Sequence, residues 1–161
     1  MPIWLVHFAH WLQNTRWALN ISGSDWAYPF VQATHFVGLS LWIGSNVAGD
    51  LRLLGVGNKR ETIAQFWQAL FVWNWIGFSV AVLGGFMLFS ANAVGYVKNP
   101  AFRIKIGVLV PMALALHIVI QRKARLWGRL PEMPMLAKFA GLVEIILWVC
   151  VAIAAVSIPE F

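Results

Sequence analysis

The sequence predicts an all-α integral membrane protein: a four-helix bundle with a short N-terminal interfacial helix. Of the 161 residues, 60% are hydrophobic and only 11% are charged, and the mean hydropathy is +0.72. Four apolar segments each approach or exceed the roughly 20 residues that a membrane span needs. Because only short turns separate these segments, we expect a single membrane domain over residues 1–161.

Turn residues and charges set the ends of each expected helix. An aromatic-rich segment at about 3–19 is short for a span, so we expect it to lie on one membrane face. The expected spans are about 26–54, 62–94, 101–126 and 135–157. Small residues along the first span, Gly38, Gly44 and Gly49 among them, favour close approach of a neighbouring helix. Pro111 can kink the third span.

The distribution of Lys and Arg predicts the orientation. Eight of them lie in or near the connections from the first to the second span and from the third to the fourth, on one side of the membrane, and four lie on the other side. Because Lys and Arg favour the cytoplasmic side, both termini are expected outside the cytoplasm, in a bacterial inner membrane. The net charge of +6 then reflects topology within a lipid bilayer, and we expect no nucleic-acid partner.

Three ionisable residues lie inside the expected spans: His35, His117 and Glu144. Such residues are costly in a bilayer and usually face the bundle interior, where they bind a cofactor, an ion or each other. A helical rise of ~1.5 Å per residue places His117 and Glu144 at a similar depth, so we expect them to meet. The same rise places His35 roughly 10 Å away, nearer the outer face.

A b-type heme in a membrane bundle needs axial His nitrogens, cations for its propionates and an apolar slot. His35 and His117 are the candidate diagonal pair of ligands, although their different depths leave His7 or His10 as another partner for His35. The candidate propionate partners are Arg16, Arg52, Arg103 and Lys105. Two His ligands leave no open position on the iron. We therefore expect an electron carrier rather than an enzyme, acting as a subunit beside another membrane or periplasmic redox protein.

Two other interpretations of these residues remain open. His7 and His10 lie three residues apart on one helix face and can clamp copper, as can His35 and His117 with other ligands. Alternatively, the polar residues form a structural network without any cofactor. The chain would then be an assembly subunit that packs its many Trp side chains and small-residue faces against a larger membrane complex.

Two segments resemble a known group of small four-helix bacterial membrane proteins. They are PFVQATHFVGLSLWIGSNVAGDLRLLG, at 29–55, and FRIKIGVLVPMALALHIVI, at 102–120. The group includes the membrane domain of copper-resistance protein D and the heme-binding four-helix protoporphyrinogen oxidase. The matching positions are Pro29, Gln32, His35, Gly38, residues 50–55 and Lys105. The resemblance implies that His35 is the first heme or metal ligand, with Lys105 near the same membrane face. It adds copper handling and porphyrin oxidation as alternative functions.

Overall fold

A computed structural model of the chain describes residues 2–57, 61–128, 130 and 132–158, and all regular structure in these ranges is helical. The all-α prediction is therefore confirmed. The elements, in order, are α1 (Ile3–Gln13), α2 (Arg16–Ser22), α3 (Ala27–Leu53), α4 (Ile63–Ala91), α5 (Ala93–Lys98), α6 (Pro100–Ile104), the π-helical turn η1 (Lys105–Leu109), α7 (Val110–Trp127) and α8 (Met135–Val156).

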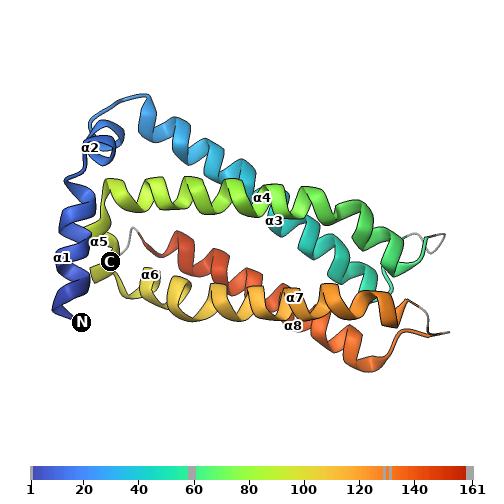
Figure 1. Ribbon diagram of the computed structural model, residues 1–161. Helices are drawn as coiled ribbons and strands as arrows, with labels where there is room; N and C mark the ends of the chain where they lie inside the picture. Colours follow the sequence, from blue (N-terminus) through green and yellow to red (C-terminus); the bar gives the residue numbers. More distant parts are fainter. Residues whose placement is uncertain (1, 58–60, 129, 131, 159–161) are drawn as a thin grey trace.

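The four long helices pack in a ring. Helix α3 contacts α4 and α8, and α7 contacts the same two helices from the other side. The short helices α1, α2, α5 and α6 gather at one end of this ring, and the end of α8 returns to the same end (Figure 1). The ring therefore has a capped end, at the short helices, and a loop end, where α3 turns into α4 and α7 turns into α8.

Three described helices are long and apolar enough to cross a membrane: Ile63–Ala91, Pro100–Ala124 and Met135–Val156. Helix α3 is also long, with 27 residues, but it is not among them. Polar residues such as Gln32, His35 and Asn46 interrupt its apolar sequence. The prediction of a membrane protein is thus supported by three of the four expected spans.

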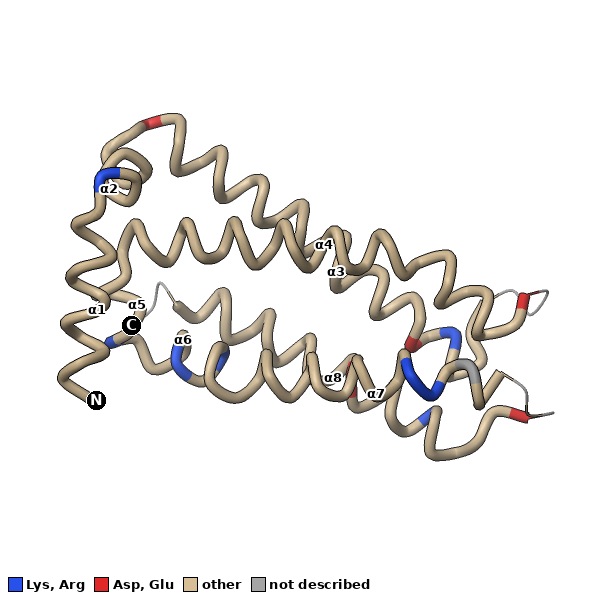
Figure 2. Tube along the Cα trace, viewed as in Figure 1, with Lys and Arg blue, Asp and Glu red and all other residues tan. Residues whose placement is uncertain are grey.

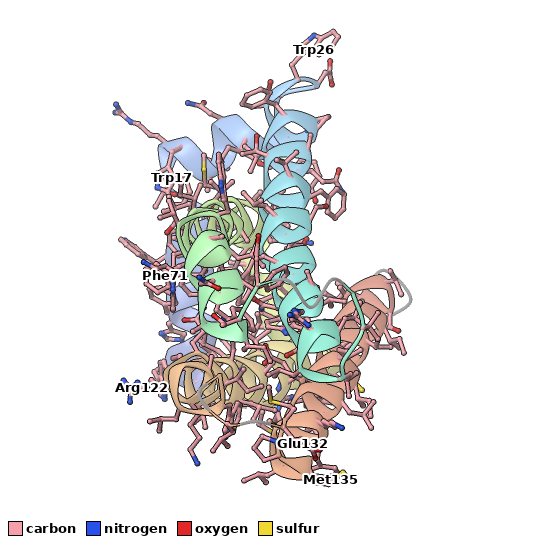
Figure 3. All side chains as sticks on the ribbon, turned by 90° about the vertical axis from the view of Figure 1, so that its right-hand side faces the viewer. Trp17, Trp26, Phe71, Arg122, Glu132 and Met135 are labelled. Atoms are coloured by element: carbon pink, nitrogen blue, oxygen red, sulfur yellow. The ribbon has the colours of Figure 1, made fainter. Side chains whose placement is uncertain are left out.

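The outer surface of the long helices is apolar, and most charges lie at the two ends. Large hydrophobic side chains such as Phe71, Val72 and Ile146 are exposed, and Phe71 points away from the ring in Figure 3. Most Lys, Arg, Asp and Glu residues lie near the helix ends, with long uncharged stretches between them (Figure 2). This pattern is typical of helices that face lipid.

Glycines on α3 allow the close approach of α4 that the sequence predicts, to the α4 backbone at Gly38 and to the Trp67 side chain at Gly49. A Cβ atom on Gly38 would lie 2.5 Å from the Ala81 nitrogen, and one on Gly49 would overlap the Trp67 ring. Gly44, in contrast, faces open space, with no described atom within 4 Å of a Cβ there. Of the three glycines that the sequence places on this face, Gly38 and Gly49 contact α4 and Gly44 does not.

Two expected helices have a different internal structure. The N-terminal segment expected at 3–19 is two helices, because the Asn14 side chain donates to the His10 carbonyl (2.7 Å) and the chain turns before α2. In the third expected span, η1 directly precedes Pro111, which lies in the first turn of α7. A proline is tolerated there because its missing N–H would have little use in a first turn.

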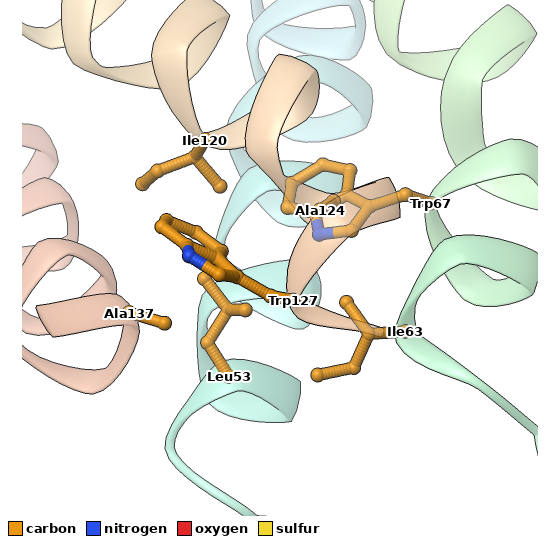
Figure 4. Close-up of a cluster of buried hydrophobic side chains, with 7 residues drawn as sticks. All are labelled: Leu53, Ile63, Trp67, Ile120, Ala124, Trp127 and Ala137. Carbon is orange, nitrogen blue, oxygen red and sulfur yellow. The ribbon is translucent and has the colours of Figure 1, made fainter. Parts of the chain in front are cut away.

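Buried hydrophobic side chains hold the ring together. At the loop end, residues from all four long helices form one cluster: Leu53, Ile63, Trp67, Ile120, Ala124, Trp127 and Ala137 (Figure 4). Nearer the middle, Trp42 packs edge-on against Trp148, with ring centroids 4.7 Å apart. These two clusters fix the positions of the polar residues that lie between and beside them.

Candidate functional site

An apolar cavity of about 720 Å³ lies toward the capped end of the ring. All of the long helices line it, and α1, α5, α6 and η1 complete its wall. Most lining side chains are aliphatic or aromatic. Besides the indoles of Trp42 and Trp148, the polar side chains on the wall are those of His35, Tyr96, Arg103 and Lys105. An apolar cavity with a few convergent polar groups is the usual form of a small-molecule or cofactor site.

The His35 ring is held in one orientation at this cavity. Its Nδ1 lies 2.7 Å from the Ala81 carbonyl oxygen. A carbonyl can only accept a hydrogen bond, so Nδ1 carries the ring proton and Nε2 keeps its lone pair. In the described part of the chain, Nε2 has no hydrogen-bond partner. A metal-binding His usually has this arrangement, with one nitrogen donating to a carbonyl and the other free to ligate.

Glycine makes room for this ring on α4. A Cβ atom on Gly85 would lie 2.9 Å from Cε1 of His35, and a Cβ atom on Gly84 would lie 3.0 Å from its Cβ. Only residues without a side chain allow α4 to approach the imidazole so closely. The Gly84-Gly85 pair therefore sets the position of His35 as directly as the Ala81 carbonyl does.

Two cations and a phenol lie on the same cavity wall. Arg103 comes from α6 and Lys105 from η1, and a π-helical turn is frequent at functional sites. Tyr96 comes from α5, outside the spanning helices. Burial, and to a smaller extent the neighbouring Tyr28 hydroxyl, raises the pKa of Tyr96 to about 12. Tyr96 is therefore a neutral phenol at any physiological pH. Together these groups suit an anionic ligand group beside an otherwise apolar body.

The structure does not bring the other candidate cations and histidines to this cavity. His7 and His10 are exposed on α1, which instead contributes Leu5 and Phe8 to the wall. Arg16 is exposed on α2. Arg52 lies at the loop end, where its Nη2 donates to the Glu61 carbonyl (2.5 Å).

His117 belongs to a separate, fully buried polar network. Its Nδ1 lies 2.8 Å from Oε1 of Glu144, so the predicted contact between these residues is confirmed. Trp148 also donates to this oxygen, at 3.1 Å. The other ring nitrogen, Nε2, lies 2.8 Å from Nε2 of Gln121 and 3.2 Å from Oδ1 of Asn74. Both nitrogens of His117 therefore have protein partners.

His35 and His117 lie at different levels of the ring, as the sequence predicts. Their partners on α4, Ala81 and Asn74, are seven residues apart, which corresponds to about 10 Å along the helix. His117 does not line the cavity that His35 faces. The two residues are not placed as a ligand pair.

Sequence reasoning missed the residues that complete the buried network. Asn74, in the most aromatic part of α4, donates to Ser45 Oγ (2.8 Å) and to Asn46 Oδ1. Asp50 is fully buried, and neither of its carboxylate oxygens has a hydrogen-bond partner among the described residues. The position of Asn74 inside an otherwise apolar span is a sequence signal that could have identified this residue.

The described residues contain no group of three or more His, Cys, Asp or Glu side chains placed to hold a metal ion. Comparison with known proteins adds no identification: no family model, curated protein or solved structure matches the chain.

Proposed function

We propose that the protein binds a b-type heme through His35 and transfers electrons within the membrane, as a subunit beside a redox partner. The observation that carries this proposal is the unpartnered Nε2 of His35 at the wall of an apolar cavity. Its ring orientation is set by the Ala81 carbonyl, as in most metal-binding histidines. A bound heme would supply one-electron redox chemistry at this position.

The rest of the cavity suits the same group. Its volume of about 720 Å³ falls within the roughly 300–1,000 Å³ that is usual for cofactor pockets. The apolar wall excludes water and favours a flat macrocycle, with Phe102, Trp42 and other aromatic side chains available to pack against it. Arg103 and Lys105 are the cations available for the two propionates, so the charge of the group is balanced from one side.

We also propose that α3 is a fourth membrane span, because it lies alongside α4 for much of its length (Figure 1). Both termini then lie on the same side of the bilayer. The excess of Lys and Arg at the loop end supports a cytoplasmic location for that end, and thus non-cytoplasmic termini in a bacterial inner membrane.

One observation favours porphyrin oxidation as a second candidate function. Of the four His residues, only His35 lines the cavity. A heme held by one protein nitrogen keeps an open position for a substrate, whereas an electron carrier usually has two axial ligands. The single His thus leaves catalysis open, in line with the resemblance to the heme-binding protoporphyrinogen oxidase.

The test is an absorption spectrum of the purified full chain. A reduced-minus-oxidised difference spectrum should show the bands of a b-type heme. Adding carbon monoxide to the reduced protein separates the two functions, because a six-coordinate carrier leaves the spectrum unchanged and a five-coordinate heme binds the gas. Absence of heme from protein purified under heme-replete expression would overturn the proposal and favour a cofactor-free assembly subunit.

A further inference from the structure

A second cavity, of about 860 Å³, opens between α4 and α7 toward the loop end. Its polar side chains, Gln68, Gln121 and Arg122, come from the parts of α4 and α7 nearest the loop end, while Phe71, Val72 and Trp75 form its apolar part farther along α4. Gln121 lies between this groove and His117, to whose Nε2 it is hydrogen-bonded at 2.8 Å. The fully buried His117 ring is therefore one side chain away from the groove.

His117 Nε2 has two partners of opposite kinds. Asn74 donates through Nδ2 to Ser45 and Asn46, which turns its oxygen toward His117 at 3.2 Å. Gln121 approaches with its NH₂ group, which also lies 3.5 Å from that oxygen. Without a proton, Nε2 accepts from Gln121; with a proton, it donates to Asn74. Both protonation states of the ring therefore have a hydrogen-bond partner already in place.

Two buried acids lie on the far side of the ring. Glu144 accepts from His117 through Oε1, while its Oε2 is buried without a partner in the described structure. Asp50 on α3 is equally buried and unpartnered. Its carbonyl lies 3.2 Å from the Cβ position of Gly141, one turn before Glu144 on α8. The packing of α3 on α8 thus places Asp50 beside the helical turn that leads to Glu144.

One ion pair within 4 Å involves these acids in the described part of the chain. It joins His117 and Glu144. Helix α4 presents the neutral Asn74 and the Trp67 indole to His117. Arg52, two residues after Asp50, directs Nη2 to the Glu61 carbonyl, and its buried Nε forms neither a hydrogen bond nor an ion pair with Asp50. An unpaired ionised carboxylate is costly in an apolar interior. Protons are therefore the charge that can neutralise both acids.

We propose that His117, Glu144 and Asp50 form a proton-binding site that exchanges protons with water in the groove through movement of Gln121. A proton from groove water adds to the lone pair of His117 Nε2. Nε2 then no longer accepts a hydrogen bond from Gln121 and instead donates one to Asn74 Oδ1. The Nδ1 proton can then move to Glu144 Oε1, which leaves the ring neutral again. Trp148 only donates, so the proton path ends at the acids. This site does not depend on heme in the other cavity.

The experiment is infrared difference spectroscopy of the full chain in lipid bilayers, recorded between a low-pH and a high-pH buffer. We expect pH-dependent imidazole and protonated-carboxyl bands. The spectra are recorded with the exposed His7 and His10 replaced by Gln, so that these two rings add no imidazole signal. Glu144→Gln or Asp50→Asn should then lower the carboxyl intensity, and His117→Gln should lower the imidazole intensity. If the wild-type protein shows no such bands, or if these variants leave the bands unchanged, the proposal is overturned.

Access through the groove is tested by transfer into D₂O. Gln121→Leu fills the same position with an apolar side chain and should slow deuteration of the carboxyl band at least tenfold. Gln68→Leu is the matched control, because Gln68 lines the same groove and is not hydrogen-bonded to His117. The control should exchange like the wild type. Equal exchange in both variants would overturn the proposed role of Gln121.

Discussion

Replacing Glu144 by Leu tests the buried network directly. Leu has a similar size but no acceptor, so it leaves His117 Nδ1–H and Trp148 Nε1–H without the oxygen they share at 2.8 and 3.1 Å. A buried donor without a partner costs about 1–3 kcal/mol, or about 2–6 kcal/mol for two. Hydrogen bonds between membrane helices average only about 0.6 kcal/mol. We therefore expect Glu144→Leu to lower the free energy of unfolding by about 2–3 kcal/mol.

The assay is equilibrium unfolding in mixed micelles, followed by circular dichroism as the fraction of denaturing detergent rises. Glu144→Gln is the matched control, because its carbonyl oxygen can accept from both donors, and we expect it to cost less than about 1 kcal/mol. The double variant, with Leu at both 144 and 117, should lose less unfolding free energy than the two single variants lose in sum. The reason is that His117→Leu removes one of the donors that Glu144→Leu leaves without an acceptor. If Glu144→Leu is as stable as the wild type, the carboxylate holds neither donor and the network argument is refuted.

Three further predictions follow from the helix packing and the cavity. Gly38→Ala should reduce the free energy of unfolding by about 1–3 kcal/mol, because the new Cβ atom meets the α4 backbone. Gly44→Ala places its Cβ atom in open space and should raise the free energy of unfolding by up to about 1 kcal/mol. The same unfolding assay measures both variants. Gly85→Ala should displace the His35 ring from its orienting hydrogen bond and weaken heme affinity by about 10–100-fold, while Gly107→Ala, at the same cavity with no clash, should not; heme titration of the purified variants compares them. A reporter that works only outside the cytoplasm should be active when it is fused to the C-terminus. Activity of a C-terminal reporter that works only in the cytoplasm would contradict the proposed orientation.

Helix positions and depths could be predicted from the sequence because they depend on local rules. The segments expected at 26–54 and 135–157 match α3 and α8 in residue range, and the one expected at 101–126 is α6, η1 and α7 in succession. Thr62 begins α4 with a capping box to Gln65. The rise per residue is fixed, so it placed Glu144 beside His117 without any knowledge of packing. Length, composition and spacing were sufficient for these statements.

The rotation of each helix about its own axis could not be predicted in the same way. His7 and His10 share a face because of their spacing, but the neighbours of α1 decide which face turns inward. Ala9 and Leu12 pack against α5, so both histidines are exposed. The Nδ1 contact of His35 is with the Ala81 backbone, and backbone partners leave no signal in residue identity.

Heme binding by His35 is tested by counting the hemes per purified chain in His35→Ala, through extraction and quantification of the heme. We expect this variant to lose the heme, because no other His lines the cavity, while folding remains intact by circular dichroism. His10→Ala is the control, since His10 is exposed on α1, and it should bind as much heme as the wild type. Full heme content in His35→Ala, with an unchanged spectrum, would contradict the account.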